Sequence, residues 1–237
     1  AGRITSMDSY NPIYAKDALG NPLNGEEGRA TVINSYQHAL TTYDYATAGR
    51  VTIESRDLGN ANALLYKQVL SLGADGALGT TDDVLISYEA PGIAQTLDSK
   101  GRITHIESTD PSTGITTVTD YTYNDSTNQA TITSTEGAKP PTTQILFLGA
   151  DKLLGTSDDK LLEYRGVDIN NKPFIQKFDL AGRITSMDSY NPIYAKDAAG
   201  NPLDGEENRA LVINSFQHAL TTYDYSTAGK VTITSLD

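Results

Sequence analysis

Cysteine and tryptophan are both absent from this chain of 237 residues. The lack of cysteine excludes a disulfide framework, a thiol nucleophile, and zinc or iron–sulfur sites with cysteine ligands. Stability is therefore expected to come from packing, hydrogen bonds or hard metal ions. No apolar run approaches the roughly 18 residues of a membrane-spanning helix, so no membrane span is predicted.

Positive charge is also scarce. The chain has 18 lysines and arginines against 30 aspartates and glutamates, which gives a formal net charge of -12 and a pI near 4.6. Such a surface repels nucleic acids and anionic membranes and favours divalent cations. Nucleic acid is therefore excluded as a predicted partner.

Recognisable catalytic motifs are missing as well. The patterns H-E-x-x-H, G-x-S-x-G and the phosphate-binding P-loop do not occur. Of the three histidines, His38 and His218 occupy the same repeat position and His105 stands alone, so no repeat unit contains a histidine cluster. We expect a protein that is not an enzyme, with its histidines on the surface or on a strand face.

A long internal repeat is the main positive feature. Residues 1–57 and 181–237 align without a gap and differ at only nine positions. Repetition at a fixed period is typical of tandem arrays, and the period here is about 180 residues. Because residue 181 lies inside a turn, Ala1 also begins in mid-turn, and we expect the chain to be one window on a longer protein.

A weaker repeat divides this period. Gly-Arg-Ile-Thr recurs at residues 2, 101 and 182, followed each time by a Tyr-x-Tyr pair and a strand rich in valine, isoleucine and threonine. These landmarks predict a repeat unit A at 1–99, a unit B at 100–180, and a truncated second copy of A at 181–237.

Turn signals and strand-forming residues alternate along the chain. Threonine, valine, isoleucine and tyrosine dominate segments such as 32–45 and 115–123, which favours strands. The fold class is therefore predicted to be all-β, with tandem β-hairpins forming an elongated β-rich rod or stacked small β-units. Hairpin turns of the pattern Asp-x-x-Gly or Asp-x-x-Asn are expected at Asp17, Asp98, Asp168, Asp179 and Asp197.

One segment is ambiguous. Apolar residues between Asn60 and Leu72 fall near helical spacing. In unit B, the corresponding segment contains Pro140 and Pro141 directly before a strand-like run, and two prolines are incompatible with a helix interior. Both segments are therefore predicted to be strands.

Two aspartate-rich loops share the pattern G-A-D-x-x-L-G-T-x-D-D, at residues 73–83 and 149–159. Loops of this length exceed the usual two to about five residues of a hairpin, so something must order them. Three carboxylates with exposed carbonyls suit Ca²⁺, which takes about six to eight oxygen ligands. Equally, the aspartates could cap backbone amides while Leu78 and Leu154 insert into the core. The candidate metal ligands are Asp75, Asp82, Asp83, Asp151, Asp158 and Asp159.

A second, weaker acidic candidate is the pair Glu26–Glu27 with its copy Glu206–Glu207. Both pairs lie in stretches rich in glycine, asparagine and proline. A solvated loop is the simpler interpretation, and a further metal site is the alternative.

Several turns resemble a known family. Residues 43–51 read Tyr-Asp-Tyr-Ala-Thr-Ala-Gly-Arg-Val, and residues 178–184 read Phe-Asp-Leu-Ala-Gly-Arg-Ile. They resemble the YD repeat of the RHS/YD family of bacterial surface and secreted proteins. The resemblance covers scattered turns, and it implies β-hairpins that coil into an extended sheet and a location outside the cell.

These observations predict a structural segment of an extracellular or cell-surface filament, stalk or fibre, with Ca²⁺ as a candidate stabilising ion. Its expected partners are neighbouring copies of the same repeat, joined head to tail. Two alternatives stay open: an adhesin-like module that binds a glycan or a surface protein, and part of an RHS-type toxin shell.

Overall fold

The computed structural model describes residues 2–15, 33–196, 198 and 213–236. Their regular secondary structure is entirely β, which confirms the predicted fold class. No helix in these ranges is long and apolar enough to cross a membrane. The chain forms two compact units, Ala1–Thr116 and Thr117–Asp237. These units do not follow the sequence repeats, whose boundaries stay a prediction.

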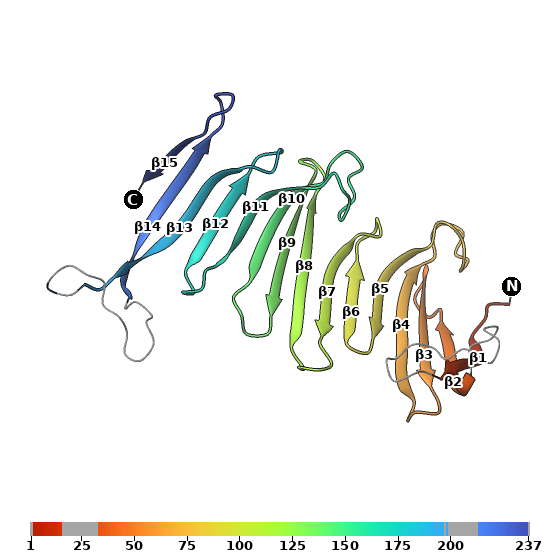
Figure 1. Ribbon diagram of the computed structural model, residues 1–237. Helices are drawn as coiled ribbons and strands as arrows, with labels where there is room; N and C mark the ends of the chain where they lie inside the picture. The colour runs from red at the N-terminus through yellow and green to blue at the C-terminus, as the bar shows by residue number, and fades with distance from the viewer. Residues whose placement is uncertain (1, 16–32, 197, 199–212, 237) are drawn as a thin grey trace, which may run out of the picture. The chain divides into compact units, whose positions relative to one another are not determined.

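In the first unit, each strand pairs antiparallel with the next strand of the chain, so strand order equals chain order (Figure 1). This is the arrangement expected of tandem hairpins. The strands are β1 (Ser6–Tyr14), β2 (Ile33–Asp44), β3 (Arg50–Asp57), β4 (Ala63–Ser71), β5 (Val84–Ala90), β6 (Ile93–Leu97) and β7 (Ile103–Thr109).

The second unit follows the same rule, and its strands also pair antiparallel in chain order. The strands are β8 (Thr116–Asn124), β9 (Gln129–Glu136), β10 (Thr142–Phe147), β11 (Lys160–Val167), β12 (Pro173–Phe178), β13 (Ile184–Tyr194), β14 (Ile213–Asp224) and β15 (Thr232–Leu236). The hairpin β13–β14 repeats the register and the bulge of β1–β2 at an offset of 180 residues.

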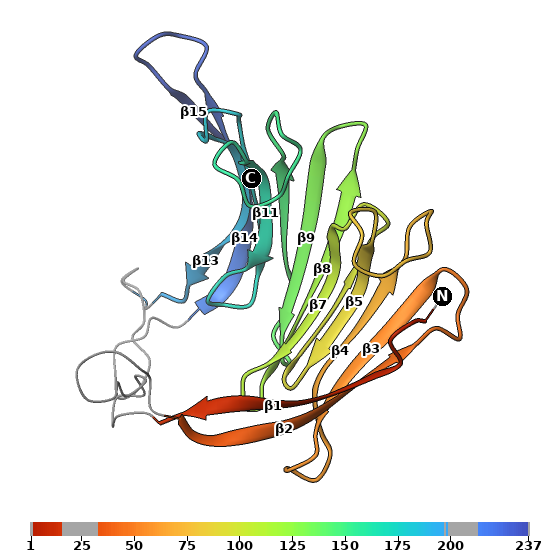
Figure 2. The same cartoon turned by 90° about the vertical axis from the view of Figure 1, so that its right-hand side faces the viewer.

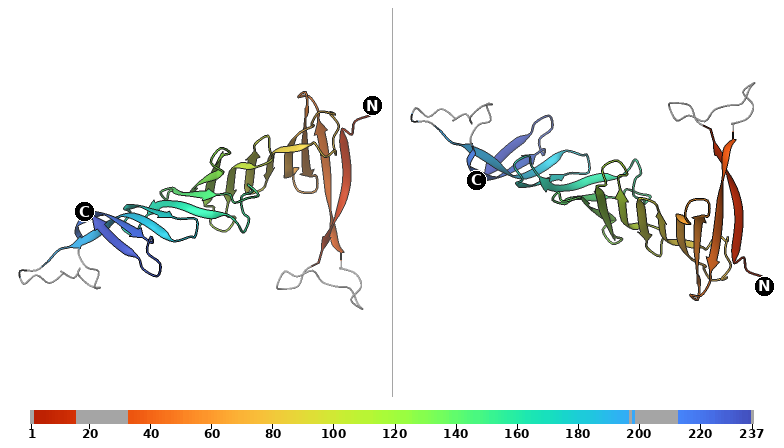
Figure 3. Two further views of the ribbon diagram at one scale, coloured as in Figure 1. Left: turned by 90° about the horizontal axis from the view of Figure 1, so that it is seen from above. Right: turned by 90° about the horizontal axis from the view of Figure 1, so that it is seen from below.

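Each unit is a single twisted layer of strands. Among the described residues, strands contact only the strands before and after them in the chain, and Figure 3 shows the strands of each unit in one layer. Figure 2 shows β1 and β2 turned steeply against β4–β7, as strand twist produces. An open layer buries little, and the apolar residues buried in the described part of the chain are Ala39, Val51, Leu72, Ala130, Leu148 and Ala219.

Hydrogen-bonded pairs of hydroxyl side chains occupy some of the positions that apolar residues would fill in a larger core. Thr41 and Ser55 lie opposite each other on β2 and β3, are both buried, and are joined by a hydrogen bond of 3.1 Å. Similar cross-strand pairs join Thr119 to Ser134 at 3.1 Å and Thr133 to Thr143 at 3.4 Å. Such pairs stabilise a sheet modestly, and they explain why the strands are so rich in threonine.

The ambiguous segment is a strand in both copies. It forms β4 in unit A and β10 in unit B, with Pro140 and Pro141 directly before β10. The prediction from the sister copy is therefore confirmed, because tertiary pairing outweighs the helical spacing of the leucines.

The predicted aspartate turns form where the structure describes them. At Asp98, Asp168 and Asp179, one carboxylate oxygen accepts hydrogen bonds from the amides two and four residues later, at 2.8–2.9 Å. The residue three positions after the aspartate has positive φ in each turn. These residues are Gly101, Asn171 and Gly182. Asp17 and Asp197 lie outside the described residues.

Candidate functional site: the aspartate-rich loops

The first aspartate-rich loop connects β4 to β5, and Asp82 lies near its end. Its Oδ2 accepts a hydrogen bond from the amide of Ala74 at 2.8 Å, and its Oδ1 accepts one from the Thr80 hydroxyl at 2.7 Å. The carboxylate thus joins the start of the loop to its end. Asx-type bonding of this kind orders a long loop without any added ligand.

The other two aspartates of this loop also cap amides. Asp75 Oδ1 accepts from the amide of Ala77 at 2.8 Å, which closes a local turn. Asp83 Oδ2 accepts from the amides of Gly79 at 2.6 Å and Thr80 at 3.1 Å. Leu78 is half-buried. All three predicted aspartates are therefore brought together in one hydrogen-bonded loop.

The second loop, between β10 and β11, repeats this network residue by residue. Asp158 accepts from the Ala150 amide and from the Thr156 hydroxyl, both at 2.7 Å. Asp151 and Asp159 accept from the amides of Leu153 at 2.9 Å and Gly155 at 2.7 Å. Leu154 is half-buried, as Leu78 is. The same geometry in two loops of different sequence indicates that the shared aspartates and threonine determine it.

These contacts bear on the two interpretations of the loops. Asp82 Oδ1 and Oδ2, Asp75 Oδ1 and Asp83 Oδ2 already accept hydrogen bonds within the loop, and the described residues include no group of three acidic or histidine side chains arranged to hold a metal. One oxygen of each final aspartate, Asp83 Oδ1 and Asp159 Oδ1, is buried without a partner. Calcium binding stays a prediction, and the capping interpretation accounts for the order of the loops. Glu26, Glu27, Glu206 and Glu207 lie outside the described residues.

A close approach of backbone to carboxylate sets the geometry at the start of each loop. Gly73 and Gly149 have φ of +53° and +56°. A Cβ atom at either position would lie 2.1 Å from an oxygen of Asp82 or Asp158, respectively. Only glycine fits there, because both the conformation and the space exclude a side chain.

The hydrogen bonds lower the pKa of the central carboxylates. The Thr80 hydroxyl, followed by the Ala74 amide, holds the pKa of Asp82 below its ordinary value of 3.8, and Thr156 and Ala150 do the same for Asp158. A carboxylate with a depressed folded-state pKa stabilises the fold above its unfolded pKa, and this contribution is lost as pH falls through the folded value.

We therefore expect the urea midpoint of unfolding to stay nearly constant between about pH 7 and 5 and to fall below about pH 4. Replacing both Asp82 and Asp158 by asparagine should reduce this acid-dependent fall, as measured by urea titrations from pH 2 to 7. An equally steep fall in the double variant would show that other carboxylates, such as Asp168 and Asp179, dominate the acid response.

A second cluster was not anticipated from the sequence. On β1 and β2, the ring of His38 stacks on Tyr10 with centroids 4.5 Å apart, and its Nε2 lies 2.7 Å from Asp8 Oδ1. The copy on β13 and β14 pairs His218 with Tyr190 and with Asp188. The histidines do lie on strand faces, as predicted. Their partners follow from the register of the hairpin, which the sequence does not display.

No protein-family model matches the chain, and a comparison with curated protein sequences finds no match.

Proposed function

We propose that the chain is a structural segment of a repeat array outside the cell, in which successive copies continue the β-sheet head to tail. The main support for this proposal is that one strand sequence occurs twice, once at an open edge and once inside the sheet. The extracellular location is inferred from the resemblance of the chain's turns to YD repeats.

The strands β1 and β13 have the same sequence from Ser6 to Tyr14 and from Ser186 to Tyr194. Among the described residues, β1 pairs only with β2, and Met7 and Tyr10 are 49% and 65% exposed. In the second unit, β12 also pairs with β13, and the corresponding Met187 and Tyr190 are half-buried. The sequence of β1 is therefore suited to a neighbour of the β12 type.

The other edge shows the same contrast. Val51, on β3, is 0% exposed because β4 pairs beside it, whereas its copy Val231 precedes β15 and is 46% exposed. Exposed apolar residues at a strand edge favour pairing with another strand. Both edges thus carry residues that their internal copies bury against a neighbour.

The exposed aromatic residues favour the array over an adhesin-like binding face. Tyr36 is exposed on β2, but its copy Phe216 is half-buried, with Lys172 Nζ 4.4 Å from the ring centre. Lys172 precedes β12, the neighbour that β1 lacks. The aromatic surface at β1 and β2 therefore corresponds to a partly covered surface in the internal copy.

The proposal can be tested with chains that contain one, two or three copies of the 180-residue period. If copies continue one sheet, the free energy of unfolding and the cooperativity should rise with copy number, because each new junction buries two edges. Urea unfolding followed by circular dichroism measures both quantities. Identical unfolding curves for all three lengths would show independent units and contradict a continuous sheet.

The same chains test the calcium prediction. A cation that binds only the folded loops raises the melting temperature. The rise in calcium over chelator should then disappear when Asp82, Asp83, Asp158 and Asp159 are replaced by asparagine. Equal melting temperatures in calcium and chelator would leave hydrogen bonds as the source of order in the loops.

A further inference from the structure

One local structure, which we call the leucine socket, occurs three times among the described residues, in the turn that follows each Tyr-x-Tyr pair. It consists of the residue with positive φ in that turn and the two residues after it: Gly49–Val51, Asn128–Ala130 and Gly229–Val231. The values of φ at its first residue are +69°, +55° and +71°, so the backbone turns alike in all three.

Two of the three sockets hold a leucine. The amide of Leu72 donates to the carbonyl of Gly49 at 2.9 Å, and the amide of Leu148 donates to the carbonyl of Asn128 at the same distance. Both leucines are buried, as are Val51 and Ala130, the last residues of their sockets. Each leucine is followed by the Gly-Ala-Asp start of an aspartate-rich loop.

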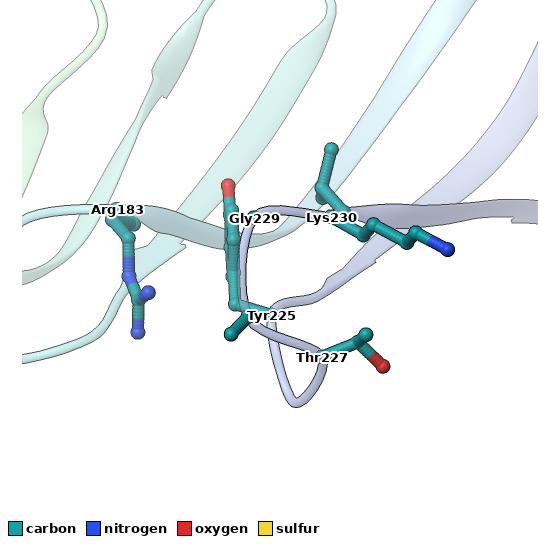
Figure 4. Close-up of a pocket in the computed structure, with 7 residues that line it drawn as sticks. Arg183, Tyr225, Thr227, Gly229 and Lys230 are labelled. Carbon is teal, nitrogen blue, oxygen red and sulfur yellow. The ribbon is translucent and has the colours of Figure 1, made fainter.

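The third socket is open. Val231, its last residue, is exposed where Val51 is fully buried. Gly229, Lys230 and Val231 line a hollow of about 390 Å³ together with Arg183 and Tyr225 (Figure 4). The Arg183 guanidinium lies 4.5 Å from the centre of the Tyr225 ring and forms one side of the hollow.

In the first unit, the residues equivalent to Arg183 and Tyr225 are Arg3 and Tyr45. Arg3 lies 4.7 Å from the ring centre of Tyr45, as Arg183 does from Tyr225. Arg3 and Tyr45 line a hollow of their own together with Asp75–Leu78 of the aspartate-rich loop, and Arg3 Nη2 donates to the Gly76 carbonyl at 3.4 Å. The loop is also acidic, which complements Arg183 and Lys230 of the open hollow.

From these internal copies we propose that the open socket at Gly229–Val231 receives a leucine and its Gly-Ala-Asp turn from a segment of unit A that corresponds to residues 58–83, the segment that supplies Leu72 to the socket at Gly49–Val51. The leucine amide donates to the Gly229 carbonyl, its side chain covers Val231, and the turn places a carbonyl against Arg183. This inference rests on the proposed array, and it adds a defined contact to the pairing of strands at β15. Recognition then combines strand addition with a side-chain pocket, a common way of binding an extended segment.

The test uses the intact 237-residue chain and a dye-labelled peptide with the sequence of residues 58–83, which contains β4 and the loop. Binding is followed by fluorescence anisotropy. A shorter peptide of residues 58–71 retains the strand but lacks the leucine and the loop. We expect the long peptide to bind at least tenfold more tightly than the short one and than a long peptide carrying Leu72→Ala.

Protein variants locate the contact. Val231→Asp and Arg183→Ala change exposed residues and should each weaken binding of the long peptide, Val231→Asp by tenfold or more. Arg3→Ala is the control at the equivalent position, which already faces a loop. Arg102→Ala is the control for the ion pair within the turn, because Arg102 pairs with Asp98 as Arg183 pairs with Asp179. Both substitutions should leave peptide binding unchanged.

The outcomes separate this inference from the proposed function. If both peptides bind equally and Val231→Asp has no effect, strands still add at β15 but the socket does not select the leucine. If neither peptide binds, and the sequence of residues 58–83 fused after Asp237 also leaves the unfolding curve unchanged, sheet continuation itself is contradicted.

Discussion

Leu72→Ala is expected to lower the free energy of unfolding of the first unit by about 2–5 kcal/mol, because it empties a buried position of a chain with few of them. Leu72 is 1% exposed and occupies the leucine socket at Gly49–Val51. Its main-chain hydrogen bond to Gly49 would remain, so the loss of stability measures the contribution of the leucine side chain. Urea unfolding curves of the variant and the parent measure the difference.

Leu236→Ala is the control for this substitution. Leu236 lies on β15 and is 60% exposed, so its replacement should change the free energy of unfolding by less than about 0.5 kcal/mol. Similar losses for Leu72→Ala and Leu236→Ala would contradict the view that the socket is a main point of apolar burial.

Gly73→Ala is expected to have the second large effect, a loss of about 2–5 kcal/mol. The left-handed conformation at φ of +53° costs about 1–2 kcal/mol for a residue with a Cβ atom. The overlap of that Cβ with the Asp82 carboxylate adds about 1–3 kcal/mol of overpacking or displaces the carboxylate from its partners. Urea unfolding measures the loss, and amide hydrogen exchange at Ala74 reports the freed loop.

Gly76→Ala in the same loop isolates the backbone contribution. Gly76 has φ of +64°, and a Cβ there would meet nothing within 4 Å. Only the cost of about 1–2 kcal/mol for the left-handed conformation is expected. If the two alanine variants were equally stable, the close approach of Gly73 to Asp82 would have no energetic role.

Much of the fold could be predicted because its information is local. The turns at Asp98, Asp168 and Asp179 follow from single short motifs, and the strand assignment of Ala63–Ser71 followed from the prolines of the sister copy. The pairing of Tyr10 with His38 could not be predicted in this way. β1 ends at Tyr14 and β2 begins at Ile33, and a separation of this length in the sequence does not indicate which residues of the two strands pair.

The sequence indicated which aspartates share a loop, but it did not indicate the groups to which they bond. Asp75, Asp82 and Asp83 do meet in one loop, as their spacing indicated. Carboxylate oxygens serve equally as ligands of a hard cation and as acceptors for amides, so residue type alone does not separate the two. The partners that decide the local geometry are the Ala74 amide and the Thr80 hydroxyl, and their positions depend on the folded path of the loop.

The identity of strand order and chain order within each unit has a consequence for how the protein reaches its folded state. Each strand needs only the strand made just before it as a template, and hairpins form within microseconds. Proteins dominated by contacts between sequence neighbours fold fast, since no distant segment must be found first. A chain emerging from the ribosome can therefore order strand upon strand during synthesis, and folding time per copy should not lengthen as an array grows.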